Sequence, residues 1–88
     1  MPHYIVERTI PKLSADELQA LGKKVVAVSD SLPGVVWIKS HISESEGKSY
    51  CEFEAPGPGV LREHAEQAGL PVDRISEVEN EVAPDMFR

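Results

Sequence analysis

Apolar and polar positions alternate in four segments of this 88-residue chain and recur at spacings of three and four residues in two others. Alternation is typical of strands with one buried face, and the longer spacing is typical of helices that pack on a core. In chain order, the patterns predict strands over 3–10, 35–44, 48–55 and 75–82, one helix that begins at Ser14 and a second helix that ends at Ala68.

Capping and turn residues bound these elements. Ser14 followed three residues later by Glu17 is a capping box, in which each side chain bonds the backbone N–H of the other residue at a helix start. Gly69 directly follows the second helix, where a left-handed residue commonly ends one. Residues 46–47, Glu-Gly, predict a tight hairpin turn between the second and third strands.

The predicted order is therefore β-α-β-β-α-β. This is the split βαβ, or ferredoxin-like, arrangement of the α+β class, with a four-stranded antiparallel sheet and both helices on one face. The chain length suits one small domain, so we expect a single domain over 1–88, with residues 83–88 as a C-terminal tail.

Alternation along the strands assigns side chains to the two faces of the sheet. The less charged sets are expected to face the helices; these are Val36, Ile38, Ser40 and Ile42 in the second strand and Cys51, Phe53 and Ala55 in the third. A turn at 46–47 would place Ile42 opposite Cys51 and His41 opposite Glu52. Glu54 then lies on the face opposite Cys51.

His64 lies within the apolar stripe of the second helix, at helical spacing from Leu61 and Ala68. A helix packed on the sheet brings this stripe over Cys51. We therefore expect Cys51 and His64 to line one half-buried pocket.

The open face of the sheet is expected to show Ile5, Trp37 and Tyr50 among carboxylates. Large apolar side chains on a surface commonly mark an interface. A second copy of the chain would cover them by face-to-face packing, which gives a dimeric α+β barrel. Alternatively, the C-terminal tail with Phe87 covers Trp37.

The formal net charge of −6 and the lack of a basic cluster argue against nucleic acid and against an anionic membrane surface as partners. No apolar run approaches the ~20 residues of a membrane-spanning helix. The start, MPHYIVERTI, lacks the basic and apolar regions of a secretory signal, so we expect a cytoplasmic protein.

Cys51 and His64 carry the main chemical hypothesis. Thiolate and imidazole suit nickel, copper or zinc, and a carboxylate such as Glu54 or Glu7 could complete the coordination. The alternative is purely structural, with the thiol acting as a small hydrophobe and the imidazole hydrogen-bonded in the core. A nucleophilic Cys–His pair is a third interpretation.

Two enzymatic alternatives use other residues. In a dimeric barrel, His41 or His64 could act as a general acid or base in a cavity between subunits, or serve a small-molecule-binding module. Pro2 would become an N-terminal secondary amine after removal of Met1, which is the base of tautomerases. Pro2 also lacks the amide N–H that an N-terminal copper or nickel chelate with His3 would need.

Several segments resemble one known family over the range from Tyr4 to Val78. These are YIVER near the start, Trp37 and Ser40 in the second strand, YCEFEAP, REHAEQAGLP and ISEV. The chain is similar to a family of small bacterial proteins, a domain of unknown function, that includes a nickel-binding protein. The spacing of Cys51, Glu54 and His64 is the most specific part of the resemblance.

The resemblance implies a ferredoxin-like homodimer and binding of a divalent metal, with nickel favoured over zinc or copper. It places Cys51, Glu54 and His64 on matching positions, and Glu7 where the nickel-binding branch has a histidine. A carboxylate in place of an imidazole makes such a site harder. Since Glu54 faces away from Cys51, a strand irregularity or two separate half-sites would be required.

Overall fold

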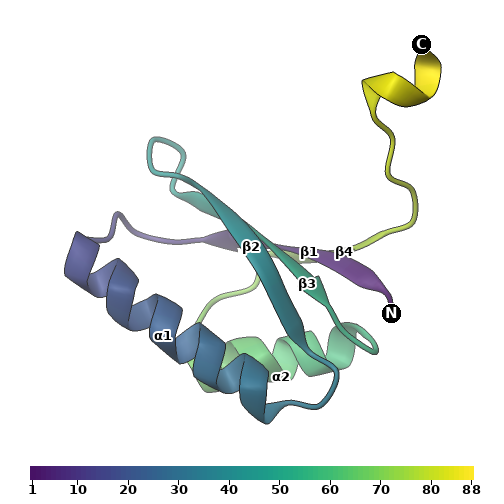
Figure 1. Ribbon diagram of the computed structural model, residues 1–88. Coiled ribbons are helices and arrows are strands. Elements are labelled where there is room, and N and C mark those ends of the chain that lie inside the picture. Colours follow the sequence, from purple (N-terminus) through teal and green to yellow (C-terminus); the bar gives the residue numbers. More distant parts are fainter.

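The computed structural model describes all 88 residues and has the predicted ferredoxin-like α+β architecture. The elements are β1 (His3–Thr9), α1 (Ala15–Ser31), β2 (Val36–Ser43), β3 (Lys48–Glu54), α2 (Pro58–Ala68), β4 (Arg74–Val78) and a 3₁₀ helix, η1 (Pro84–Phe87). The sheet has the order β2-β3-β1-β4 with antiparallel neighbours, and α1 and α2 lie side by side on one face of it (Figure 1). The other face carries no helix.

The helix ends form as the capping residues predict. Glu17 donates its backbone N–H to Ser14 Oγ at 3.1 Å, and Glu17 Oε1 accepts the Ser14 N–H at 3.0 Å. The bond from the Ser14 N–H, and after it the Ser14 side chain, lower the pKa of the Glu17 carboxyl group. Helix α2 begins at Pro58, which suits a first turn whose N–H groups lack partners. Gly69 ends it with φ of 69°, a left-handed conformation that glycine adopts without steric cost.

Strand β2 contains a bulge that changes the predicted faces. Trp37 lies opposite Phe53 and Lys39 lies opposite Glu52, so Ile38 is an extra residue between them. Trp37 therefore shares the helix-covered face with Phe53. Its predicted place on the open face is wrong, because one unpaired residue reverses the alternation before the bulge.

The same bulge moves Val36 and Ile38 out of the predicted helix-facing set. Val36 lies opposite Glu54 and is 46% exposed, and Ile38 is 40% exposed. After the bulge, Ser40 lies opposite Cys51 as a helix-facing residue, in agreement with the sequence interpretation.

The hairpin between β2 and β3 is longer than predicted. Ser43 and Lys48 form the last pair, which leaves a four-residue loop over 44–47 with Gly47 at φ of 66°. Ile42 consequently lies opposite Ser49 instead of Cys51, and His41 lies opposite Tyr50 instead of Glu52.

The core lies between the sheet and the two helices. Its buried apolar cluster consists of Tyr4, Val6, Val35, Cys51, Phe53, Ala55 and Leu61. On β1 the alternation Tyr4, Val6 continues to Arg8, whose side chain is also buried. The alternation of the strand thus places the charged side chain of Arg8 in the interior.

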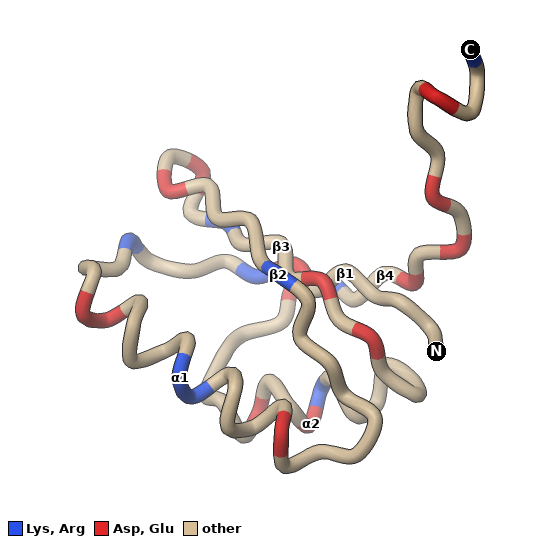
Figure 2. The backbone as a smooth tube through the Cα atoms, in the orientation of Figure 1, with Lys and Arg blue, Asp and Glu red and all other residues tan.

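The chain beyond β4 extends away from the sheet, as Figure 1 shows. Strand β4 ends at Val78, four residues earlier than predicted, and Phe87 is 75% exposed. The tail therefore leaves Trp37 uncovered, and its charged residues are mostly acidic: Glu79, Glu81 and Asp85 against Arg88 (Figure 2). Neither helix combines the length and hydrophobicity that crossing a bilayer would require.

Candidate functional site on the two faces of the sheet

The structure separates the four residues predicted to bind metal. Cys51 and His64 are buried on the helix-covered side, whereas Glu7 and Glu54 alternate with the buried positions of β1 and β3 and lie half-buried on the open face. No three His, Cys, Asp or Glu side chains of the chain lie close enough to hold one ion together. Within one copy, the four residues do not surround a common point.

His64 bonds to α1 through Ser29. Ser29 Oγ donates to the Val25 carbonyl at 2.7 Å, so it accepts from His64 Nε2, which lies 2.9 Å away. This assigns the proton of the neutral ring to Nε2 and leaves Nδ1 as a buried acceptor without a partner. The ring meets Phe53 edge-on at 5.1 Å between centroids.

Burial lowers the pKa of His64, because an imidazolium would lose its hydration there. The Val25 carbonyl opposes this effect and the positive charge of Arg8 adds to it. The structure thus favours the neutral imidazole.

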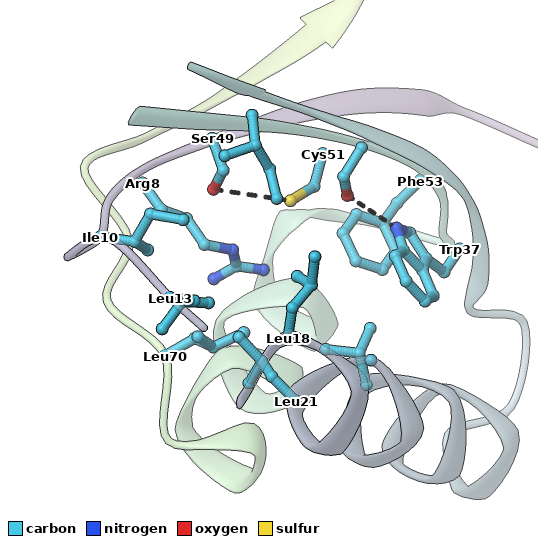
Figure 3. Close-up of a pocket in the computed structure, with 14 residues that line it drawn as sticks. Arg8, Ile10, Leu13, Leu18, Leu21, Trp37, Ser49, Cys51, Phe53 and Leu70 are labelled. Atoms are coloured by element: carbon cyan, nitrogen blue, oxygen red, sulfur yellow. Dashed lines mark hydrogen bonds between the residues drawn. The ribbon is translucent and has the colours of Figure 1, made fainter. Parts of the chain in front are cut away.

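A cavity of about 70 Å³ lies between α1 and the sheet. Its walls include Leu18 and Val25 from α1 and Trp37, Cys51 and Phe53 from the sheet (Figure 3). Cys51 therefore lines a pocket, as predicted, but His64 is not one of the residues that line it. The Cys51 thiol makes only a weak contact, to Ser49 Oγ at 3.9 Å.

Arg8 enters the same cavity from β1, and Figure 3 shows its guanidinium pointing inward. The side chain is only 2% exposed. Its one hydrogen bond runs from Nη1 to the Pro71 carbonyl at 2.9 Å, while Nε has no partner. No carboxylate forms an ion pair with it.

The open face gathers imidazoles around a carboxylate. Glu52 lies between His3 and His41, with Oε2 at 3.8 Å from His3 Nε2 and Oε1 at 3.9 Å from His41 Nε2. His3 is the direct neighbour of Glu54 in the register, and Glu7 lies further along the same face. His3 and Glu52 were not among the residues predicted to bind metal, because the pairing of β1 with β3 that brings His3 near Glu52 is a long-range contact.

Pro2 and His41, the other two residues proposed from the sequence as an acid or base, lie at the surface. Pro2 is exposed at the entry to β1, and its carbonyl accepts the Ala55 N–H at 3.1 Å. His41 is exposed on the edge strand β2.

The fold and its two chemically different faces define a small ferredoxin-like α+β protein. Residues 4–78 match the family described as "Nickel responsive protein SCO4226-like", and the chain belongs to this family. The resemblance recognised in the sequence is thereby confirmed.

The fold is similar to two solved structures. The crystal structure of SCO4226 from Streptomyces coelicolor A3(2) superimposes with a TM-score of 0.81 at 22% identity, covering 91% of this chain and 99% of that one. A structural-genomics structure of the protein YJCS gives 0.54 at 17% identity, covering 92% and 100%. At these identities the likeness establishes the fold alone. Among curated proteins, none matches the sequence.

Proposed function

We propose that the protein binds a divalent metal ion, nickel first, on the open face of its sheet. The observation that carries this proposal is Glu52 lying between His3 and His41. Imidazole and carboxylate form a borderline donor set that suits nickel, copper or zinc. The family name, which describes a nickel responsive protein, favours nickel among these.

Glu7 and Glu54 extend this donor set, because they lie on the same face as Glu52. One copy of the chain leaves the set incomplete, since no three donors converge on a point. A second copy packed face to face would bring the same residues from the opposite side, as two-fold symmetry requires. Metal binding and dimer formation are therefore proposed as coupled.

The proposed dimer interface is the open face around Ile5 and Tyr50, which are half-buried among charged neighbours. Trp37 takes no part in it, because it faces α1. The bulge removes the indole from this face, but it places Val36 opposite Glu54 and leaves Val36 46% exposed, so apolar surface is still available there.

Calorimetric titration of untagged, chelator-treated protein with Ni²⁺, Zn²⁺ and Cu²⁺ tests the proposal. We expect His41→Ala and Glu52→Gln to weaken nickel binding by about tenfold or more. Cys51→Ser and His64→Gln are the matched controls on the covered face and should bind as the wild type does. Sedimentation velocity with and without nickel reports the oligomeric state.

Two results would contradict the proposal. Absence of binding heat and of a thermal shift with all three ions would remove metal binding altogether. Loss of binding in Cys51→Ser and His64→Gln, with the open-face variants intact, would move the site to the covered face.

A further inference from the structure

We propose that the cavity between α1 and the sheet is a binding site for a small apolar monocarboxylate, whose carboxylate pairs with Arg8. This site lies on the opposite side of the sheet from the proposed metal site and does not depend on it. Its argument rests on an unpaired buried cation, an apolar chamber around that cation and an opening lined by exposed apolar side chains.

The first observation is that Arg8 lacks a counter-ion. Arginine is rarely buried without a partner, because removing its charge from water is costly unless hydrogen bonds and an opposite charge compensate. Here a fully buried guanidinium with five N–H donors uses Nη1 for one carbonyl, that of Pro71, and leaves Nε without any acceptor. An unsatisfied buried group of this kind indicates a ligand or ion that the protein itself does not supply.

The geometry of the free donors selects the ligand group. The Pro71 carbonyl uses Nη1, so the edge of the guanidinium that includes Nε makes no hydrogen bond within the protein. A carboxylate can accept two parallel N–H bonds from such an edge. Ser49, which is buried beside Arg8 and accepts only the weak Cys51 thiol contact, has a hydroxyl proton to offer the same group (Figure 3).

The rest of the cavity selects an apolar body. Beyond Arg8, two serine hydroxyls and the Cys51 thiol, its walls are mostly aliphatic and aromatic side chains, which would solvate a second charge or a sugar poorly. The Ser40 hydroxyl is already engaged by Trp37 Nε1 at 2.9 Å. These walls favour a single carboxylate with a hydrocarbon tail over phosphate or a dicarboxylate.

The size and the opening limit the length of that tail. About 70 Å³ holds the carboxylate and the first carbons of an acid but not a ring, since a cavity of roughly 150 Å³ is needed for benzene. The outer lining includes Leu18 and Ile42, each 45% exposed. A tail of roughly six carbons would extend from Arg8 towards these side chains and bury apolar surface that now faces water. We therefore choose the linear acids hexanoate and butanoate as probes.

Trp37 is the only tryptophan of the chain and lines the cavity, so its fluorescence reports occupancy directly. Titration with sodium hexanoate or sodium butanoate should give a saturable change. We expect 1-hexanol, which has the same tail without the charge, to bind at least about tenfold more weakly. Hexylammonium should not bind, because its charge repels Arg8.

Three variants locate the site. Arg8→Met keeps the length of the side chain and should weaken hexanoate by about tenfold or more. Gly22→Leu keeps Arg8 and fills the cavity, because Gly22 lines it and has no atom within 4 Å of an added Cβ. It should abolish binding. Gly59→Leu is the matched control, since Gly59 also has open space but lies on α2 outside the cavity.

Each alternative outcome overturns the proposal. Equal affinity for hexanoate and 1-hexanol would show an apolar hole in which Arg8 plays no part. Unchanged hexanoate binding in Gly22→Leu would place any binding elsewhere, and this test holds even if Arg8→Met fails to fold. No fluorescence change with either acid at saturating concentration, together with no shift of the Trp37 indole N–H resonance, would mean that the cavity takes no carboxylate.

Discussion

Acidification should destabilise the protein through His64, and the His64→Gln variant isolates the effect. Burial holds the pKa of His64 below its ordinary value of 6.5 in the folded protein, whereas the unfolded chain has the ordinary value. Below pH 6.5 the imidazole of His64 therefore binds a proton in the unfolded state but not in the folded state. The free energy of unfolding falls as pH decreases through this window and stops falling below the folded pKa.

The structure supports a large effect. Protonation would put an N–H on Nδ1, which is buried and has no acceptor, while Nε2 already donates to Ser29. One proton of difference gives a slope of ~1.4 kcal/mol per pH unit. That slope is substantial against the roughly 4–13 kcal/mol of total stability that small domains of this length have.

Urea denaturation of wild type and His64→Gln at closely spaced pH values between neutrality and the carboxylate range measures the difference. Glutamine keeps an N–H donor for Ser29 and does not titrate. His3, His41 and the carboxylates are present in both proteins and cancel in the comparison. A wild-type minus variant difference that is independent of pH, or one that grows in favour of the wild type on acidification, would refute the assignment of a neutral, buried His64.

Three further predictions concern folding stability and are checked by urea denaturation at neutral pH. Ser14→Ala should lower the free energy of unfolding by about 1 kcal/mol, because the capping box at α1 loses its acceptor; an unchanged value would mean that the cap forms without contributing. Gly22→Ala should raise it by about 0.5–1 kcal/mol through helix propensity, since the added methyl meets no atom, and destabilisation would show that α1 approaches the sheet more closely here. Arg8→Met should leave stability unchanged or raise it by about 1–4 kcal/mol, because an unpaired buried charge is removed; a loss of several kcal/mol would instead make the Pro71 contact a structural requirement.

The helices and the order of the elements could be predicted because local signals determine them. Ser14 with Glu17 marks the start of α1, and Gly69 marks the end of α2. The spacing of apolar residues along α2 predicted that His64 lies on the buried side of the helix. The structure buries this residue completely. Each of these features depends on residues within a few positions of one another.

The register of β2 could not be predicted, because it depends on pairing between strands. Nothing in the residues around Ile38 distinguishes a bulged strand from a regular one, and no glycine marks the place. The longer loop over 44–47 shifted the cross-strand neighbours by two positions. The bulge alone reversed the face of Trp37, whereas the longer loop made Tyr50 instead of Glu52 the direct partner of His41.

Arg8 escaped prediction for a different reason. Alternation places it after Tyr4 and Val6 on the covered face, but charged residues are so seldom fully buried that composition argues for the surface. Only tertiary packing shows that the Pro71 carbonyl is its one partner. Of the predicted metal ligands, Glu54 lies where simple alternation places it, opposite in face to Cys51.

The bulge at Ile38 also bears on how copies of this chain can meet. Strand β2 is one of the two margins of the sheet, and a regular margin offers a row of free backbone groups on which a neighbouring molecule can template further strands. An extra residue kinks that row and increases its local twist. Side-by-side growth into ribbons or fibrils is therefore hindered along β2.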